Sequence, residues 1–348
     1  MKKKLLPALI VTGLIILVVI IMGITALINK YTPTKKTEDL KEYFNISSDD
    51  EAALIVDNEL SDYKAKIIDK KIYVDYKFVH DSLNSRFYWD ANENVLLYTT
   101  ASDIISAAAD SNSYSVTKQT NDFGYPIVKA TSDSALIALD YVKQYSNITF
   151  KSYDDPARIV ITSKWDEIDS ATVSKSTQVR VKGGIKSPIL KEVKKDDKIT
   201  ILDSGDKWDK IATEDGVIGY IKGKALSESK KTKLTNPDYE EETFTHIKKD
   251  KDICLAWNQV TSQSANSKVP QVISSTKGIN VMSPTWFYLN DNNGNLADIA
   301  SKDYVSYCHS QGIEVWGLFS NFENTDVDAA YVLTHTSTRT TLINQIMS

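Results

Sequence analysis

One uncharged stretch near the amino terminus constrains this chain more than any other feature. From Leu5 to Ile28 there are 24 consecutive residues without a charged side chain. As a helix this stretch would be about 36 Å long, enough to cross a hydrocarbon core of about 30 Å with some tilt. Pro7 stands near its start, where a missing amide hydrogen costs least. The sequence therefore predicts a membrane-spanning helix.

A cleaved signal peptide is the alternative to an anchor. Its apolar stretch is usually only about 7–15 residues long and ends in small residues at the cleavage site. The stretch here is longer, and Ile24-Thr25-Ala26 fits that pattern poorly, so we favour an uncleaved anchor that binds the lipid bilayer. Three lysines directly before it predict a cytoplasmic amino terminus, a single crossing of the cell membrane and extracellular C-terminal domains; they are Lys2, Lys3 and Lys4.

The charge is distributed unevenly along the chain. Of its 41 basic and 46 acidic residues, the first 36 positions hold six lysines and no acid, which leaves the rest of the chain with a net charge of −11. An acidic body argues against nucleic acid as a partner, because such a protein needs a basic surface. Two cysteines form neither a disulfide scaffold nor a four-ligand zinc site, and the four histidines are scattered. We expect no metal and no cofactor.

The ectodomain begins with a polar linker, residues 31–52, followed by an internal duplication. Residues 71–100 and 124–163 each predict a strand, a helix and a hairpin of two alternating strands. The first hairpin is expected at 86–89 and 95–99, and the second at 149–153 and 158–162. Together they predict an α+β duplicated domain over residues 53–166.

This region resembles the bacterial domain named after the amino terminus of copper amine oxidases. The resemblance rests on Ile72-Tyr73-Val74, Phe78-Val79, Leu83, Trp89-Asp90 and Val95-Leu96. It implies an envelope-associated stalk or a module that interacts with the cell wall. It implies no catalysis, because the chain has no oxidase cofactor motif, and His80 is expected on the surface of a helix.

Residues 170–228 change in character, with short strands and frequent glycine turns that predict a small all-β barrel. They resemble a bacterial Src-homology-3-like domain through Val179-Arg180-Val181, Lys198–Leu202, Trp208–Ile211 and Gly219-Tyr220-Ile221. The resemblance implies contact with peptidoglycan. The alternative is a spacer in which Trp208 belongs only to the core. A second charged linker, residues 229–250, follows.

The last part, residues 251–348, alternates strands and helices. Strands are expected within 253–260, 278–289 and 313–319, and helices at 298–311 and 338–347, with Gly312 as a C-cap. This order predicts an α/β architecture with parallel strands, best explained as the first three βα units of a (β/α)₈ TIM barrel. The whole chain is thus expected to be multidomain.

These residues resemble glycoside hydrolase family 18, in its spore- and wall-associated branch from Gram-positive bacteria. The resemblance rests on Leu255-Ala256-Trp257 with Gln259-Val260, Asn280-Val281, Met282 to Phe287, Tyr304-Val305, Gly312 and Val315 to Phe319. It implies hydrolysis of glycans that contain N-acetylglucosamine. In this family the substrate's acetamido oxygen attacks the anomeric carbon while a glutamic acid protonates the leaving oxygen.

The family's D-x-x-D-x-D-x-E motif is not found in this chain. Asp326-Val327-Asp328 is not followed by the acid, and Glu323 and Asp326 are expected to be solvated loop residues. A complete barrel needs about 250 residues, whereas 98 follow position 250. We therefore name no catalytic residue and expect the chain to be the amino-terminal portion of a longer gene product.

The resemblance does imply part of a substrate-binding face, because active sites of such barrels lie at the carboxyl ends of the strands. Aromatic rings stack on sugars, and amides bond to hydroxyl groups. For each tryptophan the alternative is a place in the core. The expected substrate-binding residues are Trp257, Asn258, Trp286, Tyr288, Trp316 and Asn321.

The sequence thus predicts a membrane-anchored, extracytoplasmic glycan hydrolase of the family-18 type that lacks its catalytic segment. Its partner would be peptidoglycan or another cell-wall glycan. The alternative is a non-catalytic cell-wall-binding protein, in which the duplicated domain and the small barrel are the working parts. A signal-sensing ectodomain is a weaker alternative, because the short cytoplasmic tip could not transmit a signal.

Overall fold

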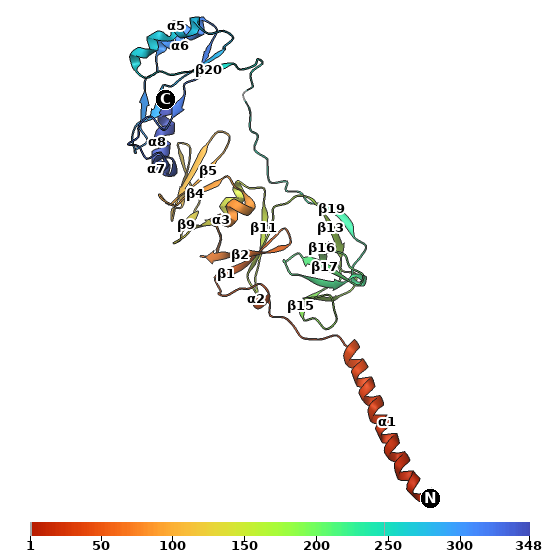
Figure 1. The fold of residues 1–348 in the computed structure, drawn as a ribbon. Coiled ribbons are helices and arrows are strands. Elements are labelled where there is room, and N and C mark those ends of the chain that lie inside the picture. Colours follow the sequence, from red (N-terminus) through yellow and green to blue (C-terminus); the bar gives the residue numbers. More distant parts are fainter. Residues whose placement is uncertain (1, 247) are drawn as a thin grey trace. The chain divides into compact units, whose positions relative to one another are not determined.

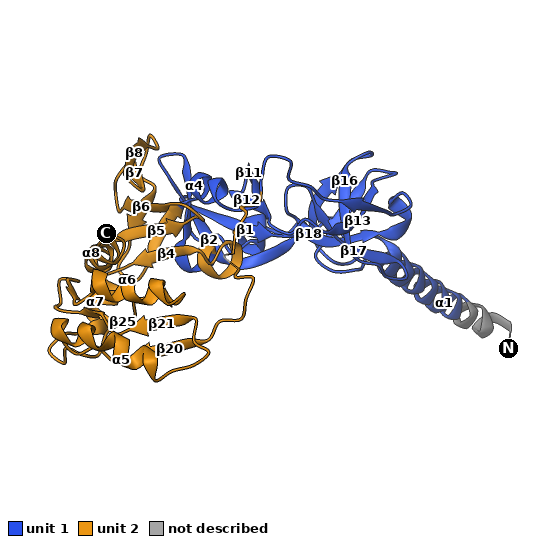
Figure 2. Cartoon of the chain, turned by 90° about the horizontal axis from the view of Figure 1, so that it is seen from above, with its two compact units in different colours: residues 1–78, 138–240 blue, residues 79–137, 241–348 orange. Residues whose placement is uncertain are grey.

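The structure, a computed structural model, describes residues 2–246 and 248–348, with side chains described from Ile10 onward. It divides into two compact units, residues 1–78 with 138–240 and residues 79–137 with 241–348 (Figure 2). Each unit is therefore built from two separate stretches of the chain. Figure 1 labels many of the helices and strands.

The first unit begins with the predicted apolar helix, α1 (Lys2–Tyr31). Its portion Ile10–Tyr31 is long and apolar enough to cross a membrane, and none of it is buried in the protein. Lys2, Lys3 and Lys4, on which the predicted orientation rests, lie outside the described side chains. The structure thus shows one N-terminal apolar helix, which suits an anchor or a signal sequence.

A mixed sheet follows α1 and the short helix α2 (Leu40–Tyr43). Its strands within this unit are β1 (Glu51–Val56), β2 (Glu59–Ile68), β3 (Lys71–Asp75), β11 (Thr149–Tyr153) and β12 (Arg158–Thr162). They run in the order β11-β12-β1-β2-β3, and β1 pairs with β12 in parallel. Two tight turns with positive φ, Asp57-Asn58 and Asp69-Lys70, join β1, β2 and β3. The unit also contains helices α3 (Tyr76–Phe78) and α4 (Leu139–Gln144).

A second sheet in this unit has seven strands in the order β15-β14-β18-β17-β16-β13-β19. They are β13 (Glu167–Thr172), β14 (Thr177–Arg180), β15 (Ile189–Val193), β16 (Lys198–Asp203), β17 (Trp208–Thr213), β18 (Ile218–Lys222) and β19 (Lys230–Lys233), with a short 3₁₀ turn at Gly223–Ala225. The sheet is open, whereas a closed small barrel was predicted. The edge at β15 is covered instead by the chain after α1, because Thr37 pairs in parallel with Ile189.

The two sheets share one hydrophobic core, although the sequence suggested separate modules. Ala53 and Ile55 of β1 pack with Val179, Ile211 and other residues of the seven-stranded sheet. Phe44, from the stretch expected to be a linker, is buried in the same core. At Gly216, a side chain would come within 2.8 Å of Val160, so the β17–β18 turn needs glycine to pack against β12.

The second unit contains a five-stranded antiparallel meander, β4 (Phe87–Asp90), β5 (Val95–Thr99), β6 (Ile104–Ala108), β7 (Ser113–Val116) and β8 (Gln119–Asp122). A turn of π-helix, Val79–Leu83, precedes it, and β9 (Val128–Ala130) pairs with β10 (Ala135–Ala138) after it. Both predicted hairpins thus form close to the expected bounds. The first lies in this unit and the second, β11–β12, lies in the other.

The rest of the second unit alternates strands and helices. In order these are β20 (Leu255–Asn258), a 3₁₀ segment (Gln263–Lys268), α5 (Val269–Ser274), β21 (Val281–Pro284), β22 (Phe287–Leu289), β23 (Leu296–Asp298), α6 (Lys302–Ser310), β24 (Glu314–Val315), β25 (Phe319–Ser320), α7 (Ala329–Thr334) and α8 (Thr336–Ile346). The parallel sheet β20-β21-β24 was predicted; α5, α7 and β23 were not. A second small sheet has the order β23-β22-β25.

Helices α5 and α6 cover one face of the parallel sheet. Met282 of β21 packs there with Tyr304 and Cys308 of α6, and Ala256 and Val315 complete the same row. Among residues 2–246 and 248–348 no sheet closes into a barrel, so the structure shows the strand–helix order without the predicted barrel.

Candidate functional site

The carboxyl end of the parallel sheet brings two tryptophans onto one row. Trp257 of β20 is in register with Ser283 of β21. Trp316 follows β24 and donates its backbone N–H to the carbonyl of Met282, 2.9 Å away, which continues the parallel pairing. Since residues in register on parallel strands point to the same face, the two indoles flank Ser283 on the face opposite α5 and α6.

Both indoles are available to solvent. Trp257 is 77% exposed and Trp316 is 39% exposed, while Ser283 between them is buried. The Trp316 indole N–H donates to the carboxylate of Glu314, 3.2 Å away. Glu314 also accepts from Lys249 at 3.0 Å. Hydrogen bonds from Lys249 and Trp316 lower the pKa of Glu314, so this carboxylate stays charged and orients one ring.

The side chain of Asn258, at the end of β20, lies on the face of the sheet that α5 and α6 cover. Its amide nitrogen donates to the hydroxyl oxygen of Tyr304, 2.7 Å away. Burial raises the pKa of Tyr304 to about 12, against the smaller lowering effect of the Asn258 hydrogen bond. The phenol therefore stays neutral and fixes the Asn258 amide on the face covered by α5 and α6, opposite the two indoles.

The other expected site residues lie elsewhere. Trp286 is only 3% exposed, and its indole N–H donates to the side-chain oxygen of buried Asn266 at 2.7 Å. Its ring meets that of Tyr304 edge to face, with centroids 5.0 Å apart, so Trp286 is part of the core under α6. Tyr288 is half-buried in β22, and Asn321 is exposed just after β25.

Ser283 and Glu314 were missed by the sequence analysis. Both belong to strands that were predicted, but the register that places Ser283 between the two indoles becomes visible only when β20, β21 and β24 are paired. The signal for Glu314 was its position two residues before Trp316, since alternate residues of a strand share a face.

No catalytic acid pair is found in the described part of the chain. Glu323 and Asp326 are exposed loop residues, as expected. Asp328 is the N-cap of α7 and accepts from the N–H of Tyr331. Across the same described residues, no group of three metal-binding side chains was found. Both cysteines are free, and burial raises the pKa of Cys308 to about 11, so its thiol is not a nucleophile.

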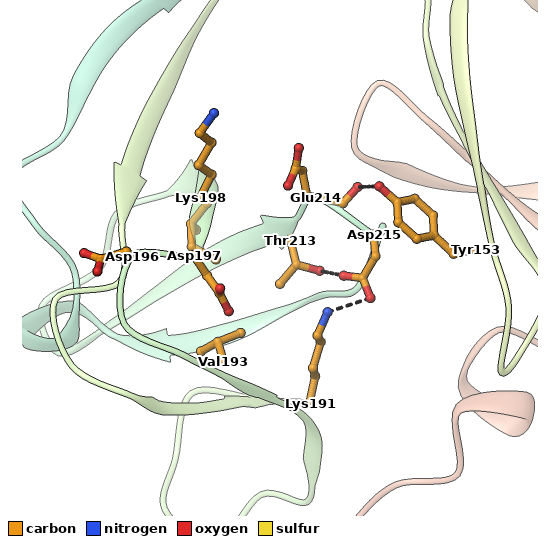
Figure 3. Close-up of a pocket in the computed structure, with 10 residues that line it drawn as sticks. Tyr153, Lys191, Val193, Asp196, Asp197, Lys198, Thr213, Glu214 and Asp215 are labelled. Atoms are coloured by element: carbon orange, nitrogen blue, oxygen red, sulfur yellow. Dashed lines mark hydrogen bonds and ion pairs between the residues drawn. The ribbon is translucent and has the colours of Figure 1, made fainter.

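A separate cavity of about 530 Å³ lies in the first unit, lined by residues of β11, β15, β16 and β17 and their turns (Figure 3). The charges around Asp215 are already paired. Asp215 binds Lys191 at 2.6 Å and Arg158 at 2.5 Å, and accepts a hydrogen bond from Thr213. The phenol of Tyr153 donates to the carbonyl of Glu214, 3.0 Å away. We interpret this cavity as part of a structural joint between the two sheets.

Comparisons with known proteins give little information. No protein-family model matches the chain, and no curated protein matches it. Among solved structures, NlpC1 from Trichomonas vaginalis is 14% identical, covers 41% of this chain and 44% of its own, and has a TM-score of 0.17. NlpC2 from the same organism is 18% identical, with coverages of 38% and 47% and a TM-score of 0.17. The chain thus spans under half the length of either, and these similarities carry no argument about its fold or function.

Proposed function

We propose that this protein is anchored in the cell membrane and binds a cell-wall glycan containing N-acetylglucosamine at the face formed by Trp257 and Trp316. The observation that supports this best is the row of two exposed indoles at the carboxyl edge of a parallel sheet. Indole faces stack on the apolar faces of sugar rings.

The half-covered sheet supports the further proposal that residues 251–348 form the first three βα units of a family-18-like barrel. Parallel sheets are normally covered on both faces, and here α5 and α6 cover one. The opposite face carries Leu255, Trp257 and Trp316, which are the residues a barrel would turn toward its interior. Hydrolysis would need an acidic D-x-D-x-E cluster, which the described residues lack.

The glycan proposal is tested on the full chain in detergent micelles. Binding to purified peptidoglycan and to N-acetylglucosamine oligomers would be compared for the wild type, Trp257→Ala, Trp316→Ala and the double variant. We expect each single variant to weaken binding by about tenfold, corresponding to about 1.4 kcal/mol. Phe244→Ala is the control, because that ring is also exposed but lies outside the sheet.

Three outcomes decide the proposal. Loss of binding in the double variant, with Phe244→Ala unchanged, would support it. Failure of the wild type to bind any of these glycans would contradict it. Undiminished retention of the double variant on peptidoglycan would also contradict it. That outcome would favour the seven-stranded sheet as the part that binds the wall.

The anchor proposal rests on α1, with the amino terminus in the cytoplasm and the remainder outside. Cys254 is exposed and lies beyond the anchor, so a membrane-impermeant maleimide added to intact cells should label it. Labelling only after the cells are opened would contradict this topology. Recovery of the protein in the medium, with its amino terminus trimmed, would show a cleaved signal sequence instead.

A further inference from the structure

The chain that leaves α1 is tied directly to the seven-stranded sheet. Only two residues separate Tyr31, the end of α1, from Thr34, whose N–H donates to the carbonyl of Ile185 at 2.8 Å. Ile189 of β15 then donates to Lys36 and accepts from Glu38, at 2.9 and 2.8 Å. The segment 34–38 therefore lies along β15, and α1 is followed at once by a docked strand.

Basic side chains at the end of β14 and in the loop that follows it reinforce this attachment. Arg180 is buried and donates to the carbonyls of Ser187, at 2.6 Å, and of Thr34, at 3.2 Å. Lys186 donates to the carbonyls of Thr32, at 2.8 Å, and of Asn29 in the last turn of α1. The loop 181–188 thus lies within one side-chain length of the end of the apolar helix.

The surface around this attachment is positively charged. The segments 29–37 and 179–191 contain no acidic residue. We call five of their exposed lysines the juxtamembrane lysines; they are Lys30, Lys35, Lys36, Lys182 and Lys186. Residues 37–348 carry a net charge of −11, so these two acid-free segments are more basic than the average of the chain.

A cavity of about 580 Å³ adjoins the same loop through Ile185. Trp208 lines it and packs against Gly183, where a side chain would approach the Trp208 Cβ to 3.1 Å. The Lys222 ammonium group lies 5.7 Å from the centre of the Trp208 ring. The charged residues lining the cavity are three lysines and two aspartates: Lys207, Lys222, Lys224, Asp206 and Asp209. A half-exposed indole beside lysines is the composition found where proteins meet lipid headgroups.

We propose that the juxtamembrane lysines and the Trp208 cavity form a surface that binds the anionic headgroups of phospholipids in the membrane that α1 crosses. This inference rests on the proposed anchor. If the end of α1 is at the membrane interface, the hydrogen bonds of Thr34 and Lys186 hold the loop 181–188 within a Debye length of the phosphates. The seven-stranded sheet then rests on the membrane, and the segment after α1 does not act as a free tether.

The test uses the full chain in lipid nanodiscs of phosphatidylcholine alone or with about 30% phosphatidylglycerol, whose anionic headgroups give the membrane a negative surface potential. Hydrogen exchange of residues 181–188 and 205–209 is measured by mass spectrometry. We expect at least about fivefold slower exchange with phosphatidylglycerol, and loss of this protection at high salt, because screening weakens surface charge interactions.

Two triple variants separate this surface from general charge effects. Lys35→Glu, Lys36→Glu and Lys182→Glu together should abolish the lipid-dependent protection. Lys164→Glu, Lys194→Glu and Lys195→Glu change the net charge equally, at exposed lysines outside both segments, and should preserve it. Loss of protection in both variants would contradict a local surface.

The remaining outcomes distinguish lipid headgroups from a soluble phosphate ligand and test the anchor itself. Equal exchange of the wild type in both kinds of disc would overturn the proposal. Equal protection by free glycerol phosphate, added to phosphatidylcholine discs, would also overturn it in favour of a soluble ligand. Elution of the chain apart from the discs would overturn the anchor, and with it the lipid surface.

Discussion

The carboxylate of Asp90 accepts hydrogen bonds from the backbone N–H and the hydroxyl of Thr336, at 2.7 and 2.6 Å, across 246 positions of sequence. Thr336 is the first residue of α8, and His335, at the N-cap position, makes no side-chain capping hydrogen bond. Glu93 accepts in the same way from Ser337, at 2.9 and 2.5 Å. The β4–β5 hairpin thus supplies the N-terminal cap of α8 from a distant part of the second unit.

Removing this cap should loosen α8. Asp90→Ala leaves two N-terminal donors of the helix without their acceptor, and loss of an N-cap costs about 1 kcal/mol, with a range of about 0.5–2. We expect hydrogen exchange in residues 336–346 to become about 2–30-fold faster, about fivefold at the central value. Asp326→Ala, at an exposed loop acid of the same unit, should leave it unchanged. Unchanged exchange in Asp90→Ala would show that the cap is dispensable.

The Asp90 carboxylate should also make the stability of α8 depend on pH. Burial opposes the charge of Asp90, but hydrogen bonds from Thr336, Asn92 and Glu93 outweigh burial, so its pKa is lowered. A lowered folded-state pKa contributes stability above the unfolded value of about 3.9, and that stability is lost as the pH falls through the folded-state value. The protection of α8 against exchange, relative to an unfolded chain at the same pH, should therefore fall below about pH 4 in the wild type. It should change less in Asp90→Ala, and parallel pH profiles would contradict this.

Adjacent acids of the first unit should differ sharply in their effect on stability. Asp215→Ala leaves the buried guanidinium of Arg158 without its counter-charge and also removes the partner of Lys191. Breaking a buried ion pair in this way costs about 3–5 kcal/mol. Glu214→Ala removes a solvent-exposed pair with Lys151, worth about 0–1 kcal/mol. Thermal unfolding of the full chain in detergent should show a large decrease only for Asp215→Ala. Equal decreases would contradict the structural joint.

One buried tryptophan, Trp286, and one exposed tryptophan, Trp316, provide another matched pair. Trp286→Phe deprives the buried oxygen of Asn266 of its donor, and an unsatisfied buried acceptor costs about 1–3 kcal/mol. Trp316→Phe, at the exposed ring, should change the free energy of unfolding by no more than about 0.5 kcal/mol. Denaturant unfolding measures both, and a larger cost for Trp316→Phe would reverse the assignment of core and surface.

The cysteines should react at very different rates. Cys254 is exposed, whereas Cys308 is buried and its pKa is raised to about 11. In the native protein at pH 8, Cys254 should be labelled by a maleimide at least about 100-fold faster than Cys308, because the thiolate is the reactive form. The variant Cys254→Ser isolates Cys308, which should become reactive only in denaturant. Rapid native labelling of that variant would contradict its burial.

Local sequence patterns determined the elements of this protein well. Three of these patterns depend only on neighbouring residues: the apolar run of α1, the alternation of β11 and β12, and the helical period of α6. They can therefore be recognised without knowing what packs against them. The same holds for Gly312, whose positive φ ends α6 directly after its C-cap residue, Gln311.

Which side chains serve a site was decided by the tertiary structure alone. Trp257 and Trp286 come from similar apolar runs of sequence, yet one is exposed on the open face of the sheet and the other is buried against α6. Phe44 lies in a polar stretch that reads as a linker but fills the shared core of two sheets. Burial depends on partners that are distant in sequence, as the cap of Thr336 by Asp90 shows, and a local pattern carries no information about those partners.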